Sequence, residues 1–178
     1  MSRVTVPNPL VDRHADQRST IDSIAFRKAR LADVAWIAAW DRAEWAHPWS
    51  QSSWVDEMER HHVVVASDGS DHPVGVIDME VVFDTAELLR VIVDPCHRGT
   101  GVGRALVRHG LDWAVAQGAR EVFLEVSDRN RVARRLYDSV GFTRVGVRRD
   151  YYGPGDDASI MVFSPPQTTT PSTRSCDV

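Results

Sequence analysis

The 178-residue chain has little of several features that indicate particular classes of protein. Lys28 is its only lysine, so Schiff-base chemistry is excluded elsewhere in the chain. The two cysteines, Cys96 and Cys176, are too few for a disulfide framework and indicate a reducing compartment. No stretch approaches the roughly 20 apolar residues of a membrane span, and the first residues contain no apolar run of signal-peptide length. We therefore expect a cytoplasmic protein with no membrane partner.

Charge of one sign is not in large excess either. The 21 basic and 25 acidic residues give a net charge of −4 at pH 7, and no basic run is present, which argues against nucleic acid as a partner. Residues 1–22 mix Pro, Asp, Arg, Ser and Thr without periodicity, and residues 165–178 are rich in Pro, Thr and Ser. We expect a flexible N-terminal extension and a disordered C-terminal tail around one folded domain, residues 23–164.

Hydrophobic periodicity within this domain predicts an α/β fold. Short alternating or apolar runs predict strands at 23–28, 63–66, 73–83, 87–93, 121–126, 143–149 and 158–163. Three- and four-residue spacing predicts helices from residue 31, at 51–60, at 101–118 and at 130–140. The order β-α-α-β-β-β-α-β-α-β-β predicts a mixed, mostly antiparallel sheet with a β-α-β crossover at its centre.

The same periodicity assigns individual side chains to the core or the surface. We expect two or three of Trp36, Trp40 and Trp45 in the core, and the pair His61-His62 at the surface. The last helix is predicted to bury an apolar stripe made of Val132, Ala133, Leu136, Tyr137 and Val140.

The crossover contains the most informative stretch, residues 91–104. An apolar strand enters an Asp-Pro turn, and three glycines at alternate positions then lead into a helix. Bare backbone N–H groups at a helix N-terminus favour an anion, and Arg98 and Arg104 add positive charge. The Walker A and Rossmann phosphate motifs both fail, because Arg104-Ala105 follows the last glycine and no glycine stands where G-x-G-x-x-G needs its third. The pattern predicts a pyrophosphate-binding loop, with a ligand-free turn as the alternative.

Residues 91–104, together with 124–126, Asn130, 136–137 and 141–142, resemble the GNAT acetyltransferase superfamily. Its loop, Gln/Arg-x-x-Gly-x-Gly/Ala, is met by Arg98, Gly101 and Gly103. Within the superfamily the chain is most similar to the bacterial ribosomal-protein-alanine N-acetyltransferases (RimI). This narrower similarity rests on residues 47–50, 148–152 and 157–161. The resemblance spans about residues 24–164 and implies a GNAT domain over 23–164.

The resemblance implies acetyl-CoA as co-substrate and no metal, and the histidines show no metal-ligand spacing. It implies contacts with CoA along the strand, the loop and the start of the last helix: Val91, Ile92, Val93, Arg98, Gly99, Thr100, Gly101, Val102, Gly103, Arg104 and Asn130. A backbone N–H near Val93 is implied to hold the thioester carbonyl as charge develops on it. By residue type alone Asn130 is an ordinary helix N-cap.

The resemblance also implies a pair of proton-transfer residues. Glu125 corresponds to the general base, acting through a water, and Tyr137 to the general acid that protonates the departing thiolate. The residues alone fit an outward-facing carboxylate on an alternating strand and a buried core aromatic. Tyr151 and Tyr152 are implied to wall the slot that receives a peptide N-terminus, whereas the residues alone fit strand aromatics. Cys96 has no paired His/Asp constellation, and the family transfers acetyl directly, so a nucleophilic role is not favoured.

The implied function is acetyl transfer to a protein N-terminal amine, with the N-terminal alanine of a small-subunit ribosomal protein as substrate and partner. Two alternatives remain open at this point. One is the same chemistry on a lysine or small-molecule amine, and the other is a non-catalytic acetyl-CoA-binding domain. Asp150 and the turn at 153–157 depart from the family at the rim of the slot, which bears on the substrate more than on the chemistry.

Overall fold

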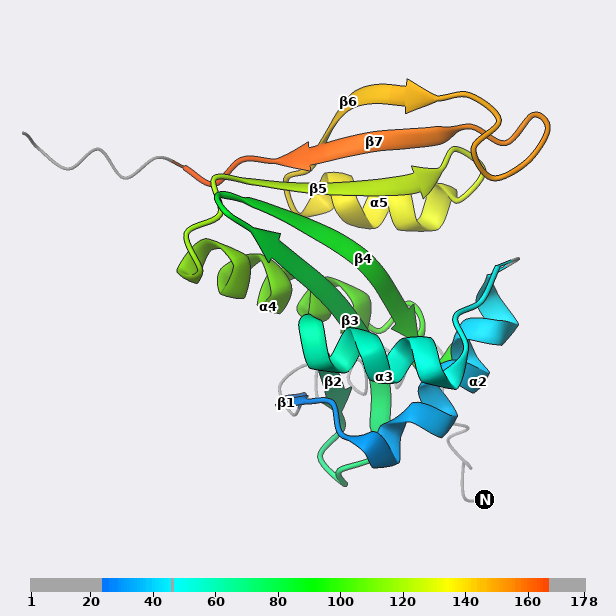
Figure 1. The fold of residues 1–178 in the computed structure, drawn as a ribbon, viewed down its shortest axis with the longest axis vertical. Helices are drawn as coiled ribbons and strands as arrows, with labels where there is room; N and C mark the ends of the chain where they lie inside the picture. The colour runs from blue at the N-terminus through cyan, green and yellow to red at the C-terminus, as the bar shows by residue number, and fades with distance from the viewer. Residues whose placement is uncertain (1–23, 46, 167–178) are drawn as a thin grey trace, which may run out of the picture.

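A computed structural model describes residues 24–45 and 47–166. The N-terminal extension predicted at 1–22 and all but the first two residues of the tail predicted at 165–178 lie outside the described residues. The described chain forms a seven-stranded sheet flanked by helices (Figure 1). No helix within it is long and apolar enough to cross a membrane.

The order of the elements agrees with the prediction. The strands are β1 (Ala25–Lys28), β2 (His62–Ser67), β3 (Pro73–Val82), β4 (Thr85–Val93), β5 (Glu121–Ser127), β6 (Thr143–Arg148) and β7 (Ala158–Phe163). The helices are α2 (Val34–Glu44), α3 (Gln51–Arg60), α4 (Val102–Ala116) and α5 (Arg131–Ser139), with short 3-10 turns η1 (Leu31–Asp33) and η2 (Pro95–His97).

The sheet order is β1-β2-β3-β4-β5-β7-β6, and neighbouring strands in it are antiparallel except β4 and β5. The parallel pair is joined through α4, which confirms the predicted mixed sheet with a central β-α-β crossover. Helices α4 and α5 pack on one face through Leu106, Ala114 and Tyr137. Helices α2 and α3 cover the other face through Ile37 and Trp54.

The prediction of two or three core tryptophans among Trp36, Trp40 and Trp45 is wrong, because all three are only half-buried. Helix α2 directs Val34, Ile37, Ala38 and Asp41 at the sheet, so its tryptophans lie along the edge of that face. Trp36 and Trp40 pack edge-to-face there, with ring centroids 4.6 Å apart. The fully buried tryptophan on this side of the sheet is Trp54 of α3.

Three further local predictions need correction. His61 and His62 are half-buried, because α3 runs directly into β2 without a loop, and the His62 ring stacks 4.0 Å from that of Trp113. Val132, placed on the apolar stripe of α5, is 81% exposed, because the first turn of that helix extends beyond the core. Strand β4 begins at residue 85 instead of 87, since the hairpin turn takes only residues 83 and 84.

One feature of the sheet positions the site. Strands β4 and β5 pair only between residues 85–87 and 121–123, and beyond these they diverge (Figure 1). Met79 pairs with Leu88 and Asp78 with Arg90, so Leu89 is an extra residue in β4, a bulge of the kind that bends a strand. The carboxyl-terminal parts of these two parallel strands therefore splay apart in a V, which we call the β4–β5 opening, and their facing backbone groups are not paired with each other.

Candidate active site

The loop that follows β4 is shaped by contacts within itself. The Asp94 side chain caps η2 by accepting from the Cys96 N–H at 3.4 Å, and it contacts His97 Nδ1 at 2.7 Å. The Thr100 hydroxyl donates to the His97 carbonyl at 2.6 Å. Gly101 then takes a left-handed conformation with φ +98°, which a side chain would strain, and α4 begins one residue later.

The start of α4 has the donors that an anion requires. Ala105 makes the first backbone hydrogen bond of the helix, donating to the Gly101 carbonyl at 3.0 Å. The N–H groups of Val102, Gly103 and Arg104 precede it, where a helix supplies no carbonyl partner and its dipole is positive. A Cβ added to Gly103 would lie 3.3 Å from Leu136 of α5 and 3.5 Å from Val93. The loop thus fits an anion such as a pyrophosphate, since its three glycines leave the neighbouring backbone N–H groups uncovered.

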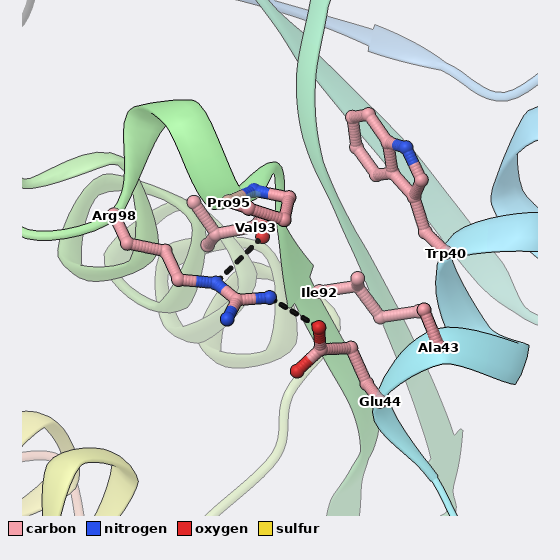
Figure 2. Close-up of a pocket in the computed structure, with 7 residues that line it drawn as sticks. All are labelled: Trp40, Ala43, Glu44, Ile92, Val93, Pro95 and Arg98. Atoms are coloured by element: carbon pink, nitrogen blue, oxygen red, sulfur yellow. Dashed lines mark hydrogen bonds and ion pairs between the residues drawn. The ribbon is translucent and has the colours of Figure 1, made fainter.

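The backbone edge of β4 lies beside this loop. The Asp94 N–H donates to Val74 of β3 at 3.0 Å, so strand alternation turns the backbone groups of Val91 and Val93 away from β3, toward the opening. Arg98 Nε donates to the Val93 carbonyl at 3.3 Å, and its guanidinium also pairs with Glu44 of α2 (Figure 2). The Arg98 charge is therefore directed at α2, beside the small pocket drawn in Figure 2, and not left free at the start of α4.

Glu125 lies on the face of β5 opposite α4 and α5, since its neighbours Leu124 and Val126 are buried against those helices. Its carboxylate accepts a hydrogen bond from Arg148 at 2.6 Å, and its side chain is 23% exposed. Its main-chain carbonyl accepts from the Tyr152 hydroxyl at 3.2 Å. The sheet therefore brings the predicted base together with the segment predicted to receive the acceptor.

A second carboxylate, which the sequence analysis missed, lies near Glu125. Glu87 of β4 pairs with Phe123 and points to the same face of the sheet as Glu125. Burial, followed by the negative charges of Glu125 and Glu80, raises the pKa of Glu87. Alternation along 85–87 is visible in the sequence, but the parallel register that sets Glu87 beside β5 is not.

Tyr137 and Asn130 both belong to α5. Tyr137 is 7% exposed and packs edge-on against Phe142, with ring centroids 5.7 Å apart. Burial raises the pKa of Tyr137 well above its ordinary value, so its phenol keeps its proton at neutral pH. Asn130 Oδ1 accepts from the Ala133 N–H at 3.0 Å, which confirms it as the N-cap of the helix. Beside it, Arg131, Arg134, Arg135 and Asp138 line an open hollow of about 300 Å³.

Tyr151 and Tyr152 lie in the turn between β6 and β7, so their interpretation as strand aromatics is wrong. Their rings meet at 79° with centroids 5.0 Å apart, and the Arg148 guanidinium lies 4.1 Å over the Tyr151 ring. Burial, helped by the charge of Glu125, raises the pKa of Tyr152 to about 12.

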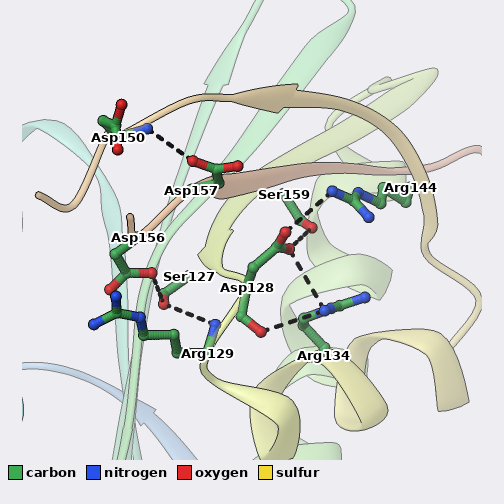
Figure 3. A network of polar contacts seen from close by, with 9 residues as sticks. All are labelled: Ser127, Asp128, Arg129, Arg134, Arg144, Asp150, Asp156, Asp157 and Ser159. Atoms are coloured by element: carbon green, nitrogen blue, oxygen red, sulfur yellow. Dashed lines mark hydrogen bonds and ion pairs between the residues drawn. The ribbon is translucent and has the colours of Figure 1, made fainter. Parts of the chain in front are cut away.

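Acidic side chains fold this turn back on the end of β5 (Figure 3). The Asp157 carboxylate accepts from the Asp150 N–H at 2.9 Å, and the Ser127 hydroxyl donates to Asp156 at 2.5 Å. Arg129 donates to the Gly155 carbonyl at 2.8 Å. Asp150 and residues 153–157, which depart from the family at the rim of the predicted slot, thus make the contacts that shape this turn.

The opposite rim depends on a buried ion pair that the sequence analysis also missed. Arg90 of β4 is 7% exposed, with its guanidinium 3.9 Å from the Trp45 ring centroid and 4.5 Å from that of Trp49. Asp41 of α2 is fully buried, lies 3.7 Å from Arg90 Nε and accepts from the Trp49 N–H at 2.6 Å. Burial lowers the pKa of Arg90, although Asp41 opposes that effect. This pair holds Trp45 and Trp49, which lie in the linker between α2 and α3, against β4 beside the opening.

Comparisons with known proteins agree with this geometry. The sequence profile described as the acetyltransferase (GNAT) family matches residues 29–142. That span contains the glycine loop, Glu125, Asn130 and Tyr137, and it ends before Tyr151. The ribosomal protein bS18-alanine N-acetyltransferase of Salmonella typhimurium is 33% identical over 131 residues, which cover 71% of this chain and 88% of that protein.

Solved structures show the same fold. The ribosomal-protein-S18-alanine N-acetyltransferase from Escherichia coli matches with a TM-score of 0.72 at 28% identity, covering 79% of this chain and 93% of that one. Ard1 from Thermoplasma volcanium shares the fold, with a TM-score of 0.75 at 23% identity over 82% of this chain and 99% of that one.

Proposed function

The chain belongs to the GNAT family of acetyl-CoA-dependent N-acetyltransferases, and from that premise we propose that its acceptor is the N-terminal amine of a protein. The proposed substrate is the N-terminal alanine of a small-subunit ribosomal protein, and the proposed compartment is the cytoplasm. The similarity to the Salmonella enzyme, whose name states that it acts on an alanine of ribosomal protein bS18, supports this choice. The observation that carries it is the Glu125 carboxylate beside the opening, held by Arg148 next to Tyr151 and Tyr152.

We assign the binding of acetyl-CoA to backbone groups. The N–H groups of Val102, Gly103 and Arg104 hold the pyrophosphate, and Arg104 supplies nearby positive charge, whereas Arg98 is paired with Glu44 and supports the loop through the Val93 carbonyl. The free edge of β4 at 91–93 receives the pantetheine arm as an added strand would be received, and Asn130 contacts CoA from α5. When bound, acetyl-CoA supplies the acetyl group as a thioester. The Val93 N–H is placed to stabilise the oxygen of that thioester as it gains charge.

In the proposed mechanism, Glu125 removes a proton from the acceptor ammonium through a water. This is a modest task, because an α-amino group has a pKa of about 7.7 to 8.0. Arg148 fixes the orientation of the carboxylate from one side. Tyr137, whose raised pKa keeps its phenol protonated, donates a proton to the departing thiolate. No acyl-enzyme is needed, and Cys96 stays outside the reaction.

The acceptor is proposed to enter between two rims. Tyr151 and Tyr152 form one wall, and the linker held by Arg90 and Asp41 forms the other. Both rims carry aromatic rings that can pack against the first side chains of an extended peptide.

The test is acetyl transfer to short peptides that differ only in their first residue, read by mass spectrometry. We expect peptides that begin with alanine to react at least tenfold faster than free lysine or small amines, and an N-terminally blocked peptide with an internal lysine not to react. Equal rates on free amines would favour the small-molecule alternative. Binding of acetyl-CoA without transfer to any amine would favour the non-catalytic alternative, and unchanged turnover in both Glu125→Gln and Tyr137→Phe would show that these two roles are wrongly assigned.

A further inference from the structure

A second cluster of chemically active side chains lies away from the β4–β5 opening, where α3 meets β3. Glu57 and His61 are one helical turn apart at the end of α3, and Asp78 lies in the middle of β3, facing that helix. His61 Nδ1 is 2.5 Å from Glu57 Oε2 and 3.5 Å from Asp78 Oδ1. The candidate ligand atoms of all three residues lie within 4.8 Å of one another.

The ligand atoms of Asp78 and His61 are buried, and Glu57 lies at the edge of the cluster. Asp78 is fully buried, and neither of its carboxylate oxygens has a hydrogen-bond partner among the described residues. His61 Nδ1 is likewise buried and without a well-aligned hydrogen bond in that part of the chain, although Glu57 is close. Arg90, which pairs with Asp78 across the sheet, is engaged with Asp41 and two tryptophan rings instead. Three orphaned polar atoms converging on one point require a partner, because such groups are costly to bury unpaired.

We propose that Glu57, His61 and Asp78 bind one divalent transition metal ion, with Zn²⁺ as the ion that their donor set fits. One imidazole nitrogen and two carboxylate oxygens suit zinc, whereas magnesium and calcium take oxygen ligands. Tetrahedral zinc with ligands at about 2.0 to 2.1 Å sets its donor atoms about 3.3 to 3.4 Å apart. The 3.5 Å between His61 and Asp78 already matches this spacing.

The Glu57 carboxylate must move by roughly 1 Å from His61 to fit the same geometry. It is on a helix end, with a side chain 17% exposed, so rotation of that side chain is enough. The other ring nitrogen of His61, Nε2, lies 3.7 Å from Glu80 Oε2. A carboxylate on that side orients the ring and leaves Nδ1 free for the ion, as partners of metal-bound histidines do.

The site is structural in character. Its ligands come from α3 and β3, so a bound ion ties the helix to the sheet and neutralises the buried Asp78. Three protein ligands leave a fourth position, which a water can fill. The proposal is independent of the acceptor chosen by the acetyltransferase site, because none of its ligands contacts the glycine loop or Glu125 in the described structure.

The experiment titrates the chelator-treated full chain with ZnCl₂ by calorimetry and measures bound metal by mass spectrometry. We expect one zinc per chain, a higher melting temperature with zinc, and much weaker binding of Mg²⁺. Asp78→Asn and Glu57→Gln should each weaken zinc binding at least tenfold. His72→Ala, which removes a histidine with a 78% exposed side chain, and His97→Ala should leave it unchanged.

Because Asp78 is buried, Asp78→Asn can unfold the chain by itself, so circular dichroism checks each variant. Glu57→Gln lies at the edge of the cluster and keeps the test decisive. Absence of bound zinc in the wild-type protein overturns the proposal. The proposal is also overturned if both Asp78→Asn and Glu57→Gln still bind zinc. Loss of zinc binding in His72→Ala or His97→Ala would overturn it too, since the ion would then be bound by a surface histidine.

Discussion

The two sides of the β4–β5 opening are built differently. On the cofactor side, most side-chain contacts that shape residues 94–104 join neighbours, such as Asp94 with His97 and Thr100 with His97, three positions apart, with the Arg98–Glu44 pair as a long-range exception. On the acceptor side, Arg148 reaches Glu125 across 23 positions and Ser127 reaches Asp156 across 29. The cofactor loop is therefore a local structure, whereas the acceptor slot exists only once the sheet has formed.

This difference separates two kinds of sensitivity to mutation. A change in the loop acts on its own backbone and should affect CoA binding alone. A change on the acceptor side removes a contact between distant segments and should affect the reaction or the peptide while CoA binding persists. The variants below are chosen so that each reports on one side.

The largest effect is expected from Glu125→Gln. Glutamine keeps the shape and can still accept the hydrogen bond from Arg148, but it cannot take a proton. General-base catalysis is worth about 10²- to 10⁴-fold, so kcat/KM should fall by that factor, with unchanged affinity for CoA. Steady-state kinetics and calorimetric CoA titration measure the two quantities.

Two neighbouring carboxylates serve as controls for that experiment. Glu121→Gln changes an exposed residue at the start of the same strand and should leave kcat/KM intact. Glu87→Gln tests the rival carboxylate on β4. If Glu87→Gln abolishes turnover and Glu125→Gln does not, the base is Glu87 and the assignment from family resemblance is wrong.

A smaller effect, on the affinity for CoA and not on the proton transfer, is expected from Gly101→Val. Valine at φ +98° costs about 1 to 2 kcal/mol of backbone strain and displaces the N–H groups at the start of α4. CoA affinity should fall at least tenfold. Gly118→Val is a matched control, because Gly118 has φ +94° and open space around it at the other end of the helix. The Gly118→Val variant should lose similar stability in thermal unfolding but keep its affinity for CoA. An equal fall in CoA affinity in both variants would contradict a specific role for the loop.

The same contrast explains how much could be predicted from the sequence. The strand, Asp-Pro turn, glycines and helix of residues 91–104 are consecutive, so their arrangement follows from local propensity, and the order of helices and strands along the chain follows from periodicity. The splay of β4 from β5 could not be predicted, because it depends on the bulge at Leu89 and on where pairing stops.

Side-chain partners across the sheet were beyond prediction for the same reason. Strand register decides that Arg148 meets Glu125, and the packing of α2 and α3 on the sheet decides that Asp41 meets Arg90 and that Asp78 faces His61. Periodicity also misplaced Val132, because it identifies the face of a helix but not which turn extends past the core. Residue types were enough to predict the glycine loop of the cofactor side, whereas the contacts of Glu125 and Arg90 on the acceptor side became visible only in the fold.

The smallest effect is expected from Tyr152, which links the acceptor side to the main chain of Glu125. Tyr152→Phe removes one hydrogen bond and should lower the free energy of unfolding by about 1 kcal/mol near neutral pH. The pKa of Tyr152 is raised to about 12, whereas a tyrosine in the unfolded chain ionises near 10. Burial is the main cause of this raised pKa, so the folded state holds the Tyr152 proton longer, and the stability of the wild type relative to Tyr152→Phe is constant below about pH 10 and falls as pH rises toward 12.

Urea unfolding between pH 8 and roughly 12 measures that loss. The wild-type advantage over Tyr152→Phe should shrink through this window, because phenylalanine has no proton to lose. Tyr151→Phe, at a more exposed ring in the same turn, is the control and should leave most of the pH dependence in place. Parallel pH profiles for wild type and Tyr152→Phe would mean that the hydroxyl does not hold the turn to β5. The turn would then be held to β5 by Arg148, the Asp156–Ser127 contact and the Arg129–Gly155 contact.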